Sequence, residues 1–141
     1  MHTRTEFSPL RWLLALTALC ILTVGSARAD SYEDALSSAR LGDTAQLVDL
    51  LKRGIDPDTV DDQGNTLLIL AAREGNTETV KALLSFKPKL SHRNLAGDSA
   101  LMLATLRGSL DLVNVLVAAG AEFEHDGWTP LIYAAFEGHL E

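Results

Sequence analysis

Glycine residues recur along this chain at a regular interval of about 33 residues, the repeat interval, and this restricts the folds open to it. Gly42, Gly75 and Gly108 form one series, and Gly64 and Gly97 form a second series with the same spacing. The apolar residues that repeat in the same phase are Leu68 and Leu101, Ala71 and Ala104, and Val80 and Val113. Such self-similarity is typical of a repeat array, in which each repeat buries its apolar face only against its neighbours.

The pattern within each repeat is helical. Leu101, Ala104 and Thr105 follow one another at helical spacing, so they share one face of a helix. After Gly108, a second helix is indicated by an apolar stripe comprising Leu112, Val113, Leu116 and Val117. We therefore expect each repeat to be a hairpin of two short helices.

Residues at the ends of the expected helices support this division. A hydroxyl side chain precedes each first helix, at Thr66, Ser99 and Thr129, where it can accept a hydrogen bond from a free backbone N–H group. Gly54 and Gly120 follow second helices, where a left-handed residue ends a helix at little cost.

One helix end departs from the pattern. Lys87 stands one repeat interval after Gly54 and one before Gly120, and Pro88 follows it. A side chain at this position predicts that the left-handed turn is weakened in the second repeat.

The repeating segments resemble the ankyrin repeat family. Residues 61–75 and 126–141 reproduce its frame of a turn glycine, a capping threonine and a Leu-x-x-Ala-Ala helix, and residues 94–105 are a looser copy. The resemblance implies an all-α solenoid of stacked helix hairpins with β-hairpin-like fingertip loops. The repeats would span about 32–63, 64–96, 97–126 and an incomplete 127–141. The first is expected to be the N-terminal cap, with a wet face carrying Ser37, Ser38 and Arg40.

The N-terminal segment has the features of a secretory signal peptide. Arg4 and Arg11 precede an uncharged apolar run, 12–24, which is shorter than a membrane span. Small residues then lead to Ala29, after which we expect cleavage, leaving residues 30–141 as the repeat domain. Cys20, the single cysteine, lies within the removed part, so the mature chain would suit an oxidising compartment such as the periplasm. The alternative is that the segment stays as a membrane tether.

The sequence predicts neither catalysis nor a cofactor. No two of the histidines His92, His125 and His139 fall four residues apart on an expected helix, and no Gly-x-Ser-x-Gly or phosphate-binding loop is present. Residues 122–126 bring Glu122, Glu124, His125 and Asp126 together in one loop. We expect a solvated acidic turn there and no metal site. A weak metal or small-ligand site in that loop is the alternative function.

The net charge of -7 falls to -9 for residues 30–141, and this acidity argues against nucleic acid as the partner. The resemblance implies a protein partner, bound on the concave face formed by the fingertips and the first helices. The residues expected to contact it are Asp62, Gln63, Asn65, Arg73, Glu74, Leu95, Asp98, Leu106, Arg107, His125, Trp128, Phe136 and Glu137. Trp128, Leu106 and Phe136 are expected to form an apolar patch on that face, since exposed tryptophan is enriched among interface hot spots. The alternative is that Leu106 and Phe136 pack on each other across the stack, and that Trp128 packs on its own loop.

Overall fold

The computed structural model describes residues 29–122. The chain divides into two segments, Met1–Ser31 and Tyr32–Glu141. Within the second segment, residues 32–41 are helical and five further helices follow within the described range. These are α2 (Thr44–Lys52), α3 (Leu67–Glu74), α4 (Thr77–Leu84), α5 (Ala100–Leu106) and α6 (Leu110–Ala118).

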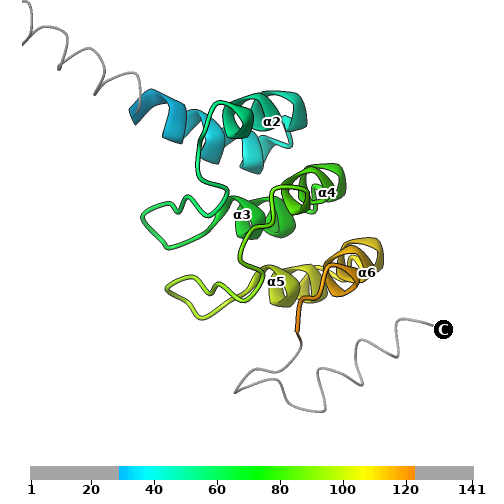
Figure 1. Cartoon of the computed structure of the whole chain (residues 1–141). Coiled ribbons are helices and arrows are strands. Elements are labelled where there is room, and N and C mark those ends of the chain that lie inside the picture. Colours follow the sequence, from blue (N-terminus) through cyan, green and yellow to red (C-terminus); the bar gives the residue numbers. More distant parts are fainter. Residues whose placement is uncertain (1–28, 123–141) are drawn as a thin grey trace, which may run out of the picture. The chain divides into compact units, whose positions relative to one another are not determined.

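The helices form two layers, with the loops between repeats projecting to one side. Helix α3 packs on α5 in the layer of first helices, and α4 packs on both α2 and α6 in the layer of second helices. Within a repeat, α3 packs on α4 and α5 packs on α6 (Figure 1). The expected all-α stack of helix hairpins is confirmed.

The hydroxyl residues expected to begin the first helices do so. The Thr66 side chain accepts a hydrogen bond from the backbone N–H of Ile69 at 3.2 Å, and Ser99 accepts one from Met102 at 3.3 Å. Each oxygen satisfies an N–H group that has no partner inside its own helix. Thr129, the third expected cap, lies outside the described residues.

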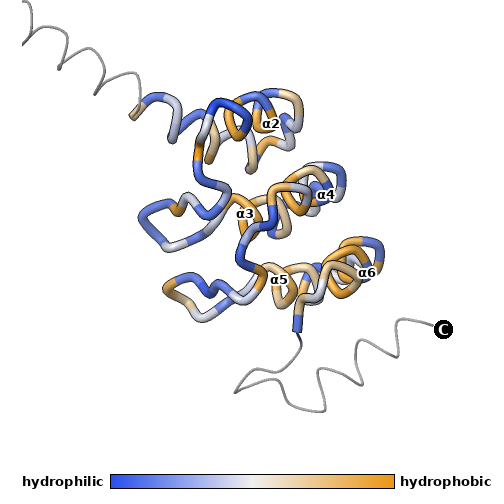
Figure 2. Tube along the Cα trace, in the orientation of Figure 1, coloured by the Kyte–Doolittle hydropathy of each residue, from blue (hydrophilic) through white to orange (hydrophobic). Residues whose placement is uncertain are grey.

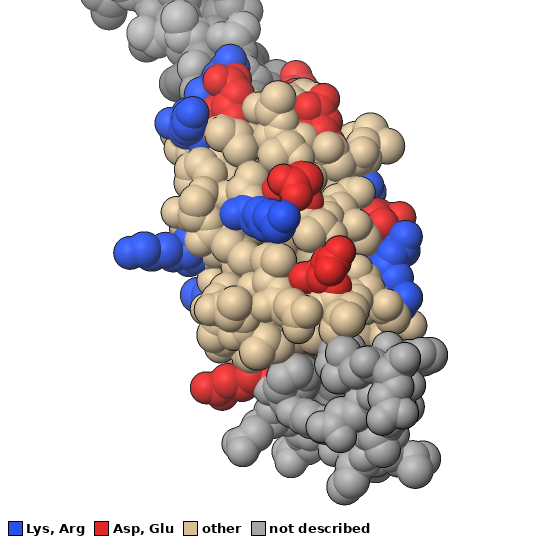
Figure 3. Space-filling view, turned by 90° about the vertical axis from the view of Figure 1, so that its right-hand side faces the viewer, with Lys and Arg blue, Asp and Glu red and all other residues tan. Residues whose placement is uncertain are grey.

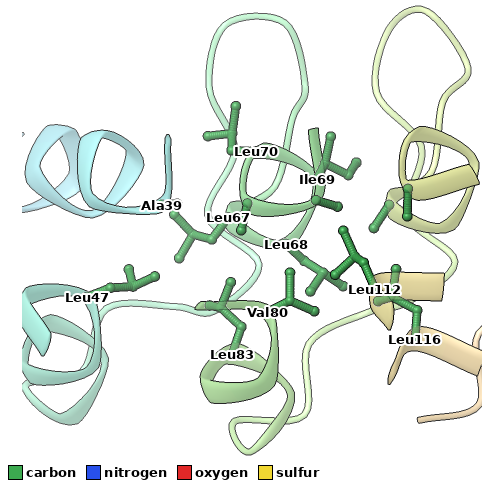
Figure 4. Close-up of a cluster of buried hydrophobic side chains, with 14 of the residues drawn as sticks. Ala39, Leu47, Leu67, Leu68, Ile69, Leu70, Val80, Leu83, Leu112 and Leu116 are labelled. Carbon is green, nitrogen blue, oxygen red and sulfur yellow. The ribbon is translucent and has the colours of Figure 1, made fainter. Parts of the chain in front are cut away.

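The apolar core is continuous from repeat to repeat. Residues 67–72, most of α3, are all buried, because this helix has a repeat on each side. Hydrophobic positions gather where helices face one another, while the loops are largely hydrophilic (Figure 2). Figure 4 shows side chains of three successive repeats in one cluster, including Leu47, Val80 and Leu112.

Ser38 was expected on the wet face of the first repeat, and this expectation was wrong. Its exposed fraction is 2%, whereas Ser37 and Arg40 are exposed as expected. Ser38 stands one repeat interval before Ala71, which is also buried, so the fold buries this position in both repeats, and both residues there are small.

The left-handed turn that was expected to be weakened at Lys87 is formed, with the lysine itself in the left-handed conformation. Lys87 has a φ of 54°, the only positive φ of a non-glycine residue within the described range. Its N–H donates to the carbonyl oxygen of Leu84 at 3.1 Å, and Pro88 behind it is buried. The packing of the neighbouring loop therefore holds a lysine in a conformation that costs an L-residue about 1–2 kcal/mol.

This strain leads to a stability prediction. Lys87→Gly is expected to raise the free energy of unfolding by about 1 kcal/mol, because glycine adopts positive φ without a steric penalty. Urea unfolding followed by circular dichroism would measure the change. Lys87→Ala is the matched control: it removes the same charge but keeps the Cβ atom, so it should give no such gain. Equal midpoints for the two variants would show that the backbone is not strained here.

Candidate functional site

Two finger loops project beyond the first helices, and each is built around one polar side chain. In the first finger loop, residues 56–65, Asp61 Oδ1 accepts hydrogen bonds from the backbone N–H groups of Gln63 at 3.0 Å and Asn65 at 2.9 Å. The Asp61 N–H donates to the Asn65 carbonyl at 3.0 Å, and Gly64 in between has a φ of 73°. An isolated antiparallel bridge joins Val60 to Thr66. The finger is thus a short hairpin-like turn, as expected.

The second finger loop, residues 89–98, makes the same turn with an uncharged side chain. Asn94, one repeat interval after Asp61, accepts hydrogen bonds on Oδ1 from the N–H groups of Ala96 at 3.0 Å and Asp98 at 2.9 Å. Its own N–H donates to the Asp98 carbonyl at 3.1 Å. An amide oxygen therefore replaces a carboxylate oxygen without changing the turn.

Hydrogen bonds connect the two fingers to each other. The Leu95 N–H donates to the Gln63 carbonyl at 3.0 Å, and His92 Nε2 lies 3.0 Å from the Gly64 carbonyl. Because a carbonyl only accepts, Nε2 of His92 must carry the proton, which gives this histidine a structural role in the finger. The fingers therefore form one surface.

Asn65 lies at the centre of this network. Its Nδ2 donates to both carboxylate oxygens of Asp61, at 3.1 and 3.0 Å, while its Oδ1 accepts from Asn94 Nδ2 at 2.8 Å and Arg73 Nη2 at 2.7 Å. Asn65 was expected to contact a partner, and this expectation was wrong: it is 1% exposed. Buried amides of this kind must be hydrogen-bonded within the fold, which Asn65 is at both ends.

The Asp61 carboxylate is largely covered, with 6% of its side chain exposed, and it pairs with Arg40 at 2.8 Å. Burial alone would raise its pKa, but hydrogen bonds outweigh this. The donors are Asn65 through its side chain and backbone, then Arg40, then the Gln63 N–H, and together they lower the pKa of Asp61 below its ordinary value of 3.8. Asp61 is therefore charged at neutral pH.

Most of the other residues expected to face a partner are exposed. Leu95 is 79% exposed on the second finger and Leu106 is 71% exposed at the end of α5. The remaining exposed members of the set are Asp62, Gln63, Arg73, Glu74 and Arg107, and Asp98 is half-buried. His125, Trp128, Phe136 and Glu137 lie outside the described residues, so the expected patch of Trp128, Leu106 and Phe136 is described only at Leu106.

Two polar side chains tie successive repeats together at the ends of the first helices. Asn76 Nδ2 donates to the carbonyls of Ala39 and Arg40, at 3.2 and 3.1 Å. Arg107 Nη1 donates to the Arg73 carbonyl at 2.9 Å and lies so close to Gly75 that a Cβ there would collide with its guanidinium. The sequence did not predict these roles, because no single residue type signals them.

Two further findings concern metals and membranes. Between residues 29 and 122, no group of three or more His, Cys, Asp or Glu side chains is placed to hold a metal ion. Of the acidic loop 122–126, only Glu122 falls in this range. No helix in the same range is both long enough and apolar enough to span a bilayer.

Stacked helix hairpins with fingers define an α-solenoid of short repeats. The family model for ankyrin repeats (three copies) matches residues 35–126 and again 88–141, so the chain belongs to the ankyrin repeat family. Ankyrin repeats are protein–protein interaction modules.

The chain is similar to segments of much longer proteins. It is 36% identical over 105 residues to glycerophosphocholine phosphodiesterase gde1 of Schizosaccharomyces pombe, covering 71% of this chain and 9% of that protein. It is 36% identical over 99 residues to the nuclear factor NF-kappa-B p105 subunit of Rattus norvegicus, covering 67% of this chain and 10% of that protein. It is 38% identical over 80 residues to the ankyrin repeat and KH domain-containing protein mask-1 of Caenorhabditis elegans, covering 53% and 3%. The chain thus spans a tenth or less of these relatives, whose names describe unlike functions, so the similarity concerns the repeat.

The low pKa of Asp61 makes a prediction about stability at acid pH. A group whose pKa is lower in the folded than in the unfolded protein adds stability that is fully present above its unfolded pKa and is lost as pH falls through its folded pKa. Asp61→Asn keeps an oxygen for the turn, as Asn94 does, but removes this titration. The difference in unfolding free energy between the wild type and Asp61→Asn should therefore be constant above about pH 5 and shrink below about pH 4.

Urea unfolding at a series of pH values would measure it. Asp62→Asn is the matched control, since it removes one charge from the same turn and leaves the Asp61 carboxylate and its hydrogen bonds in place. A wild-type minus Asp61→Asn difference that does not change between pH 6 and about pH 2 would contradict the assignment.

Proposed function

We propose that this protein binds a protein partner through the concave face formed by the finger loops and the C-terminal ends of the first helices, and that it catalyses no reaction. The observation that carries the proposal is the exposure of Leu95 and Leu106 on that side of the stack, at 79% and 71%. Aliphatic side chains exposed in this way can form the apolar centre of an interface once a partner covers them. The membership of the ankyrin family supports a protein as the partner.

The opposite side of the stack has fewer features that would select a protein partner. The face formed by the second helices carries acidic and basic side chains scattered singly over a largely uncharged surface (Figure 3). Some of these charges are paired locally, as Lys81 is with Glu78 at 2.8 Å. Ion pairs and single charges spread in this way favour solubility and do not select a partner.

We also propose that the protein acts in a secreted compartment, the periplasm if its source is a Gram-negative bacterium. The support is the sequence of residues 1–29, with its arginines, short apolar run and small residues before Asp30. The absence of cysteine from residues 30–141 fits an oxidising compartment, where an unpaired thiol would be oxidised.

Site-specific photo-crosslinking would test the binding face. With p-benzoylphenylalanine in place of Leu95 or Leu106, irradiation in cells that make the protein should give one discrete crosslinked species, identified by mass spectrometry. The same probe at Asn114, exposed on α6, is the matched control and should give none. Crosslinks from Asn114 alone, or none from either leucine, would argue against the concave face.

Intact-mass measurement of the protein purified from its own cells would test the compartment. We expect the mass of a chain that begins at Asp30, recovered in the periplasmic fraction. A mass that includes residues 1–29, in the membrane fraction, would instead support the tether.

A further inference from the structure

Two arginines occupy the same position in successive repeats, yet the structure gives them different partners. Arg40 and Arg73 are separated by one repeat interval, each near the end of a first helix. Arg40 Nη2 pairs with the Asp61 carboxylate at 2.8 Å. Arg73 Nη2 donates to the amide oxygen of Asn65 at 2.7 Å, and the ion pairs formed within residues 29–122 do not include Arg73. Among the described residues, a carboxylate neutralises the first guanidinium and none neutralises the second.

The difference arises from one exchange in the fingers. The residue that corresponds to Asp61 in the second finger is Asn94, which forms the same turn but has no charge. Asn94 donates to Asn65 Oδ1, the same oxygen that accepts from Arg73. Arg73 therefore meets an amide network where Arg40 meets a carboxylate.

Arg73 is nevertheless held in position. The amide oxygen that binds it belongs to a residue that is 1% exposed and is fixed by Asp61 and Asn94. The guanidinium has further N–H donors in a planar fork that matches a carboxylate, and Arg73 is exposed. Because the Arg73 side chain is already ordered, binding of a ligand to it costs less side-chain conformational entropy than binding to a freely moving arginine would.

The residue one repeat interval after Arg73 is apolar and not charged. Leu106 stands one repeat interval after Arg73, and its side chain is 71% exposed. Along the first helices, the side chains thus change from a cation paired with a carboxylate, Arg40, to a cation with no carboxylate partner in the described range, Arg73, and then to an aliphatic group, Leu106. A partner that complements this row presents an acidic group beside an apolar one.

We propose that Arg73 receives a carboxylate side chain of the protein partner, while an aliphatic side chain of the same partner packs against Leu106. This inference rests on the proposed function and narrows it to an acidic, aliphatic segment. The chain has a net charge of -7, so acidic partners are disfavoured over most of its surface. Recognition then depends on a local cation, which gives specificity as well as affinity.

A pair of short synthetic peptides would test the proposal. In one, glutamate and leucine alternate; in its twin, glutamine replaces every glutamate. Fluorescence anisotropy should show that the full chain binds the glutamate peptide and binds the twin at least about tenfold more weakly, the loss expected for a charge-assisted hydrogen bond. In ¹⁵N NMR spectra of the arginine side chains, the Nε–H resonance of Arg73 should shift on binding.

Three variants separate this site from general electrostatics. Arg73→Gln should lower the affinity for the glutamate peptide about tenfold or more. Arg40→Gln, the matched control, removes the same charge one repeat earlier and should leave that affinity nearly unchanged. Asn94→Asp copies the Asp61 arrangement into the second finger and should weaken binding while Arg73 is still present. Thermal unfolding by circular dichroism checks that each variant is folded.

Other outcomes would overturn the assignment. Equal losses for Arg40→Gln and Arg73→Gln, or equal affinity for the two peptides, would show that Arg73 has no special role. If the peptide result is negative while crosslinkers at Leu95 and Leu106 still capture one protein, the binding function stands and only the carboxylate assignment fails. If neither gives a signal, both proposals fail.

Discussion

The fold depends on the burial of each repeat against the repeats on either side. Helix α3 makes this plain, because residues 67–72 are all buried although the helix is short. A lone hairpin would leave half of that surface in water, and each buried leucine contributes about 1.5–3 kcal/mol only when it is fully covered. Successive repeats must therefore match in shape. The constant repeat interval in the sequence reflects this requirement for matching shapes. Turn glycines such as Gly64 and Gly97 recur at this interval because each repeat needs the same left-handed turn.

A second constraint acts at the fingers, where backbone polar groups leave the helices. The network around Asn65 satisfies these groups and joins neighbouring fingers through buried amide and carboxylate groups. Removal of one member would leave the others buried without partners, at a cost of about 1–3 kcal/mol each. The fingers are therefore as firmly specified as the core. A surface built on such fingers is ordered before any partner arrives, which favours binding.

The sequence predicted the parts of the fold that local chemistry determines. Thr66 and Ser99 cap helices because a hydroxyl placed just before an apolar helix can accept a hydrogen bond from a free N–H group. The apolar spacing within each repeat predicted the helix hairpins that the structure shows. Errors came where a residue's environment is set by another repeat. Ser38 looked like a surface serine and Asn65 like a variable contact, yet both are buried, and Asn65 is bound by Asn94 of the next finger. At Lys87 the sequence indicated strain, and the turn forms in spite of it.

The candidate site shows the same division. Leu95 and Leu106 are exposed at positions where the family resemblance implied contact with a partner. The anchoring of Arg73 could not be predicted in that way, because it depends on a contact between two fingers. A signal was present nonetheless in the pairs of residues one repeat interval apart: arginine is kept from Arg40 to Arg73 while aspartate changes to asparagine from Asp61 to Asn94. A comparison of such pairs, and not of single positions, identifies Arg73 as a charge that has no carboxylate partner among residues 29–122.

The exchange of Asp61 for Asn94 between the two fingers suggests one way in which a repeat protein can acquire specificity for a partner. Asp61 and Asn94 both offer one oxygen to two backbone N–H groups, so the turn has the same geometry with either side chain. The exchange of aspartate for asparagine therefore leaves the stacking of the repeats unchanged. It does change the charge balance at the neighbouring arginine, because only the carboxylate neutralises the guanidinium. A position that belongs to the structural frame of the repeat can thus set the charge of the neighbouring surface without altering its shape. Partner selection need not reside only in the exposed, variable residues. Here the charge difference between the two fingers lies in one buried side chain, Asp61 in the first and Asn94 in the second.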